Sequence, residues 1–81
     1  MRIDGARQLE QFSRYLGDRG LPATRQRLAV AEVLCFFADH LSAEEVARLV
    51  RQGGTTVGTA TVYRTLDLLV ESGLVREHDF G

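Results

Sequence analysis

A capping box in the middle of the chain marks the start of a helix. Its two capping residues are Ser42 and Glu45. In such a box the serine hydroxyl accepts the glutamate's amide proton, and the glutamate carboxylate accepts the serine's amide proton. We expect the helix to cover 43–52, because a glycine pair follows at 53–54 and glycine adopts the left-handed conformation at a helix end without steric penalty. Local sequence therefore defines both ends of this helix.

A second helical segment follows after the short link 55–58. Val62, Leu66 and Leu69 recur at helical spacing and predict an apolar face on a helix over 59–72. Two helices joined by so short a connection are typical of a helix-turn-helix pair, in which the second helix enters the major groove of DNA.

Apolar residues at helical spacing predict two further helices before this pair. One covers 5–17, and the other, capped by Thr24, covers 24–38. The apolar positions of the earlier helix are Leu9, Phe12 and Leu16. Those of the later helix are Val30, Val33, Leu34 and Phe37.

The last segment, 74–80, is predicted to be a β-strand. The order of three helices, a short turn, a fourth helix and a strand is that of a winged helix-turn-helix. We therefore expect one mainly α domain over 1–81, with a wing strand whose partner strand is missing because the sequence ends at Gly81.

Composition limits how such a domain could bind a partner. The formal net charge is -1, so bulk charge does not favour nucleic acid and any DNA binding must come from local placement. All ten basic residues are arginine, which suits phosphate and base recognition but is equally explained by genomic base composition.

No apolar run approaches the roughly 18 residues of a membrane span. The single cysteine and the lack of an apolar signal segment favour a reducing cytoplasm.

Catalytic and metal sites have little support. The segment 53–58 is rich in glycine and threonine, yet it lacks the lysine of a phosphate-binding P-loop and follows a helix instead of a strand. Cys35 lies in an apolar helix and is expected to be a buried thiol. His40 is interpreted as a loop histidine or, alternatively, as part of a metal site. It could form only part of such a site, because a zinc site needs three or four ligands. We expect no enzyme and no cofactor in this chain alone.

The 59–72 helix carries the candidate binding residues. Arg64 points away from its apolar face and Tyr63 lies at the border, within the first two turns that normally meet base edges. Arginine can bond guanine with two donors, and a tyrosine ring can contact thymine methyls. Thr59 and Thr61, at the helix N-terminus, could hold a phosphate. Alternatively, Tyr63 packs at the core edge and Arg64 pairs with an acidic residue of its own helix, Asp67 or Glu71.

Four motifs occur in an order and spacing that resemble the N-terminal domain of the ferric uptake regulator (Fur) family, over roughly residues 10–81. They are Gly20-Leu21 with Thr24-x-x-Arg27, His40-x-Ser42-Ala43-Glu44-Glu45, Ala60-Thr61-Val62-Tyr63-Arg64-Thr65-Leu66, and Ser72-Gly73-Leu74-Val75. The third motif is unusually specific.

The resemblance implies a metal-responsive transcriptional repressor that binds AT-rich operators in double-stranded DNA as a homodimer. By motif position, Tyr63 and Arg64 match the family's base-contacting pair, and Arg27 matches an arginine near the DNA backbone. His40 matches a histidine that helps to bind the regulatory metal in many members. The resemblance places the rest of that site, for iron, zinc or manganese, in a C-terminal domain of full-length relatives.

One departure from the family concerns the minor groove. Many members have a basic residue where this chain has Pro22, so Arg19 or Arg25 would have to supply the cation that enters the minor groove. The unpaired edge of the 74–80 strand suggests an alternative function, a winged-helix protein-interaction module that pairs through this strand.

Overall fold

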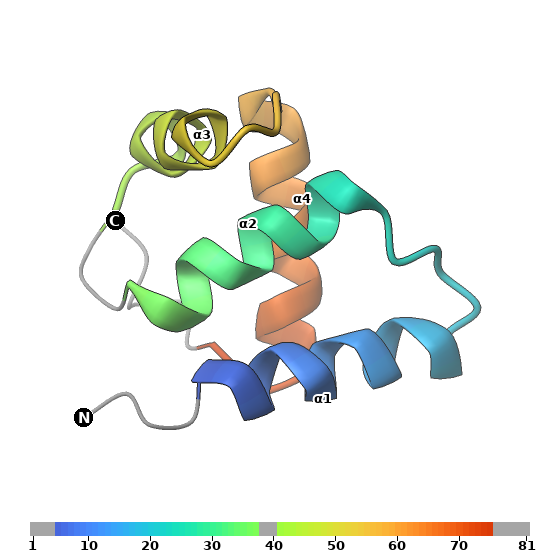
Figure 1. Ribbon diagram of the computed structural model, residues 1–81. Coiled ribbons are helices and arrows are strands. Elements are labelled where there is room, and N and C mark those ends of the chain that lie inside the picture. Colours follow the sequence, from blue (N-terminus) through green and yellow to red (C-terminus); the bar gives the residue numbers. More distant parts are fainter. Residues whose placement is uncertain (1–4, 38–40, 76–81) are drawn as a thin grey trace.

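The computed structural model describes residues 5–37 and 41–75, and these form four helices (Figure 1). The helices are α1 (Gly5–Asp18), α2 (Arg25–Phe36), α3 (Ala43–Gln52) and α4 (Thr59–Glu71). The prediction of a mainly α domain with four helices is confirmed. Within the described ranges, none of these helices is long and apolar enough to cross a membrane.

The helix caps explain where α2 and α3 begin. The Thr24 hydroxyl accepts the amide proton of Arg27 at 3.1 Å. At α3 the predicted capping box is present, with Glu45 N to Ser42 Oγ at 3.1 Å and Ser42 N to Glu45 Oε1 at 2.8 Å. The bounds predicted for α3 are therefore confirmed at both ends.

The predicted end of α2 is wrong. The helix stops at Phe36, and Phe37 has extended dihedral angles while its amide still bonds the Val33 carbonyl. Because the chain leaves the helix there, Phe37 no longer follows the helical spacing that was expected to bury it, and it is 54% exposed. The predicted last residue of this helix, Ala38, lies outside the described residues.

The predicted wing strand is not seen. Of the segment 74–80 the structure describes Leu74 and Val75, which form a bend, and the remainder lies outside the described residues. Gly73 has a φ of 82°, and the amides of Leu74 and Val75 both point back to the Leu69 carbonyl, at 3.2 and 3.4 Å. The chain thus folds back on the end of α4, and the described part offers no strand edge for the alternative interaction module.

The core consists of two apolar clusters on either side of α2. The first joins α2, α3 and the start of α4, and the second joins α1, α2 and the end of α4. Leu34 packs against both clusters. In Figure 1, α2 lies between α1 and α3, and α4 crosses behind it from α3 to α1. Cys35 is buried, as predicted.

Candidate nucleic-acid interface

Helix α4 is anchored near both of its ends. Val62 belongs to the first apolar cluster and Leu69 to the second, and neither side chain is exposed. Leu66, the third residue of the predicted apolar face, is also buried. Because contacts at both ends fix the rotation of α4 about its axis, they also decide which side chains face solvent.

Tyr63 and Arg64 lie on the solvent side of α4. Tyr63 is 53% exposed, and Arg64 is exposed, with its Nη2 at 3.5 Å from Thr61 Oγ1. Arg64 forms no ion pair with Asp67 or Glu71, which are both described. The absence of that ion pair is against the alternative for Arg64, while Tyr63 has about half of its surface exposed.

Thr65 is a residue of this site that the sequence pattern did not single out. It is fully buried, and its hydroxyl donates a hydrogen bond to the Thr61 carbonyl at 2.8 Å. A buried hydroxyl without a partner would cost free energy, so this bond makes the burial possible. Its position three residues after Val62 could have indicated that it lies on the buried face of the helix. Threonine, however, does not count as apolar when hydrophobic periodicity is assessed.

A surface hollow of about 290 Å³ brings part of the predicted set together. Arg27 from α2 lines it, and Thr61 and Arg64 line it from α4. The remaining lining residues are Pro22, Thr24, Gln26 and Thr65, so the hollow has no carboxylate. It can therefore accommodate an anion close to the outward face of α4.

Arg27 also has an internal contact. Its Nη1 donates to the Pro22 carbonyl at 2.8 Å, which holds the segment between α1 and α2 against the first turn of α2. Arg25, at the first position of α2, and Thr59, at the first position of α4, are both exposed. Thr59 lies on a different groove, between α3 and α4.

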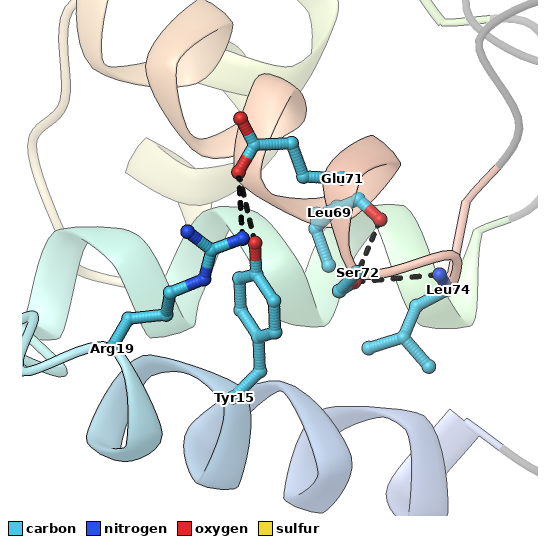
Figure 2. Close-up of polar contacts among 6 residues, drawn as sticks. All are labelled: Tyr15, Arg19, Leu69, Glu71, Ser72 and Leu74. Carbon is cyan, nitrogen blue, oxygen red and sulfur yellow. Dashed lines mark hydrogen bonds and ion pairs between the residues drawn. The ribbon is translucent and has the colours of Figure 1, made fainter.

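Arg19 is engaged at the opposite end of α4 (Figure 2). Its Nη2 lies 3.6 Å from Glu71 Oε1, and its guanidinium lies 5.0 Å from the centre of the Tyr15 ring. The Tyr15 hydroxyl donates to the same Glu71 oxygen at 2.9 Å. Desolvation, followed by the hydrogen bond to Glu71, raises the pKa of Tyr15 above its ordinary value. Of the two arginines that could replace a basic residue at Pro22, Arg25 forms no ion pair with a described carboxylate.

The described residues do not provide a metal site. No group of three or more histidine, cysteine, aspartate or glutamate residues within 5–37 and 41–75 could hold a metal ion. His40, the predicted partial ligand, lies outside the described residues. The described residues therefore do not by themselves fit a metal ion.

Comparison with known proteins gives a consistent result. A family model described as the ferric uptake regulator family matches residues 18–81. The ferric uptake regulation protein of Neisseria meningitidis serogroup C is 37% identical over 75 residues, which are 89% of this chain and 52% of that protein. The Bacillus subtilis ferric uptake regulation protein is 40% identical over 75 residues, 91% of this chain and 50% of that protein.

A relative named for a different metal also matches. The zinc uptake regulation protein of Mycobacterium tuberculosis is 43% identical over 56 residues, 69% of this chain and 43% of that protein. The chain spans about half the length of the curated relatives it matches. No solved structure matches the chain.

Proposed function

The chain belongs to the ferric uptake regulator family, and from this premise we propose that it is the sequence-specific DNA-binding domain of a metal-responsive transcriptional repressor. The observation that carries the proposal is the outward face of α4. Tyr63 and Arg64 are exposed in its first two turns, while Val62 and Thr65 on its other side are fully buried. A helix that reads bases needs one face packed in the core, which fixes its orientation, and one face exposed to contact the DNA.

In the proposed complex, α4 lies in the major groove. Arg64 bonds the O6 and N7 acceptors of a guanine, and the Tyr63 ring contacts a thymine methyl group. The contact between Arg64 and Thr61 supports this role, because it restricts the guanidinium before DNA arrives.

Phosphate contacts would position the domain without reading sequence. We assign them to Thr59 and Thr61 at the start of α4, and to Arg25 and Arg27 at the start of α2. The hollow lined by Arg27 and Arg64 supports the assignment, since it brings donors from both helices together. Because Arg19 is bound to Glu71, Arg25 is the stronger candidate for the minor-groove role that Pro22 cannot fill.

The names of the relatives refer to ferric and zinc uptake, which supports a role in metal-responsive regulation. From the resemblance to the family, we further propose that the full-length regulator responds to a divalent metal, iron, zinc or manganese, and acts as a homodimer on AT-rich operators. His40 would supply part of the metal site. The cytoplasm, where the chromosome of a bacterium lies, is the location that fits this role.

A gel-shift titration of the 81-residue chain tests the reading role. Arg64→Ala should weaken binding to an AT-rich palindromic duplex by about 1 to 3 kcal/mol, because it removes a bidentate hydrogen bond to a base. Tyr63→Ala should weaken it as well. Arg14→Ala is the matched control, since Arg14 is exposed on α1 and pairs with Glu10 at 3.8 Å. Unchanged affinity in both α4 variants would contradict the proposal.

A further inference from the structure

Arginines on different helices of this domain have different electrostatic surroundings. Both ion pairs found within 5–37 and 41–75 neutralise an arginine in or directly after α1: Arg14 with Glu10 at 3.8 Å and Arg19 with Glu71 at 3.6 Å. The arginines of α2, α3 and α4 form no ion pair with any described carboxylate. Guanidinium groups without an ion pair to a described carboxylate therefore occur on α2, α3 and α4, and also at Arg7 of α1.

Helix α3 contributes two of these arginines, Arg48 and Arg51. They lie three residues apart, which places them on one side of the helix, and both are exposed. Both line a groove of about 490 Å³ between α3 and the start of α4, where Thr59 is on the other wall. The groove is thus continuous with the helix that we propose reads the bases.

Carboxylates of α3 lie in the same groove and oppose an anion. One of them, Glu45, is engaged at the helix N-terminus, where its Oε1 accepts the Ser42 amide proton at 2.8 Å. Glu44 remains, as the other acidic residue among those that line the groove. The amide hydrogen bond leaves the charge of Glu45 in place, so two guanidinium groups and two carboxylates line the groove, and the guanidinium groups are its charged donors for a phosphate.

We propose that Arg48 and Arg51 bind phosphates of the DNA strand that borders the major groove occupied by α4. The inference rests on the proposed function, and it adds α3 as a second contact surface. In a helix-turn-helix the first helix crosses the DNA backbone while the second enters the groove. The side of α3 next to α4 therefore meets a row of phosphates, and arginine suits phosphate because its planar fork donates two parallel hydrogen bonds.

These two contacts would give DNA binding a local electrostatic component in a chain of net charge -1. Each phosphate neutralised by a protein cation releases counterions, so the logarithm of the affinity falls with the logarithm of salt by roughly 0.9 per contact. Two contacts from α3 should add about 1.8 to that slope. They should do so for every duplex, because phosphates carry no sequence information.

A salt titration of the 81-residue chain tests the proposal, using an AT-rich palindromic duplex and a GC-rich duplex of equal length. The double variant Arg48→Ala/Arg51→Ala should lower the slope by about 1.8 on both duplexes. Its affinity deficit should then be on the order of tenfold larger at about 50 mM salt than at about 200 mM. Arg48→Lys/Arg51→Lys should retain most of the slope. The charge-matched control is Arg7→Ala/Arg14→Ala on α1, which lies across α2 from α3 (Figure 1).

The outcomes separate this proposal from the proposed function. The α3 assignment would be overturned if the salt dependence of the affinity decreased no more in the α3 variant than in the α1 control. The reading role would stand in that case if Arg64→Ala still abolished the preference for the AT-rich duplex. Failure of the unmodified chain to bind either duplex would overturn both. Since all four substituted arginines are exposed, thermal unfolding should show that each variant folds.

Discussion

At the scale of single residues, Glu71 connects two side chains near the end of α4. One of its carboxylate oxygens accepts the Tyr15 hydroxyl proton at 2.9 Å and lies 3.6 Å from the Arg19 guanidinium, so three side chains from α1, the following loop and α4 meet at the end of α4 (Figure 2). Beside it, the Ser72 hydroxyl donates to the Leu69 carbonyl at 2.7 Å. These contacts hold the end of α4 opposite to the proposed reading residues.

The pH dependence of Tyr15 should report its hydrogen bond to Glu71. Desolvation and the Glu71 hydrogen bond raise the pKa of Tyr15 above 10.0, so folding favours the neutral phenol. The resulting stabilisation is fully present below pH 10 and is lost as pH rises through the raised folded pKa. In a Tyr63→Phe background, which leaves Tyr15 as the only tyrosine, phenolate absorbance should titrate above the ordinary tyrosine value. Glu71→Gln should move the midpoint down, and equal midpoints would contradict the hydrogen bond.

Part of the site at this scale could be predicted from the sequence. The outward direction of Arg64 follows from helical spacing, because Val62, Leu66 and Leu69 define the buried side. The contact between Tyr15 and Glu71 could not be predicted, since 56 residues separate them and nothing local marks the pair. The same holds for the bond from Arg27 to the Pro22 carbonyl, which depends on a loop path.

At the scale of elements, local signals account for some boundaries and not for others. The capping box and the glycine pair define α3, where Gly54 takes the left-handed conformation with a φ of 99°. The end of α2 has no glycine or proline to mark it, so the apolar pattern continued past the true end at Phe36. At the end of α4, the bonds from Leu74 N to the Leu69 carbonyl and from Gly73 N to the Val70 carbonyl form a Schellman-type cap, with Gly73 at the left-handed position. The glycine marks this helix end in the sequence, but it does not determine whether a strand follows directly.

The capping box of α3 should contribute measurably to stability. Ser42→Ala removes the acceptor for the Glu45 amide, and such a change costs about 1 kcal/mol, with a range of about 0.5 to 2. Urea unfolding followed by circular dichroism measures the change. Thr56→Ala is a suitable control, because Thr56 is exposed in the link before α4 and lies outside both helices. A destabilisation no larger than that of the control would show that the cap has no role in stability.

At the scale of the whole molecule, the two apolar clusters together hold one helix in place. The helix α4 spans both clusters, with Val62 in one and Leu69 in the other, so its outward face is held by the entire core. Arg14 and Arg19 form ion pairs, while Arg7, Arg48, Arg51 and Arg64 form none with described carboxylates. The net charge of -1 does not show where individual arginines lie, which is why composition alone could not locate a DNA-binding surface.

The central claim is that the outward face of α4 reads DNA. The most direct test is a nuclear magnetic resonance titration, in which the backbone amide signals of the isotope-labelled chain are followed as an AT-rich palindromic duplex is added. We predict that the largest shifts occur in the first two turns of α4, around Tyr63 and Arg64, and along the groove side of α3. Amides on the outer face of α1, around Arg7 and Arg14, should move little. Shifts centred on α1 or on Leu74 and Val75, with the α4 amides unchanged, would contradict the account.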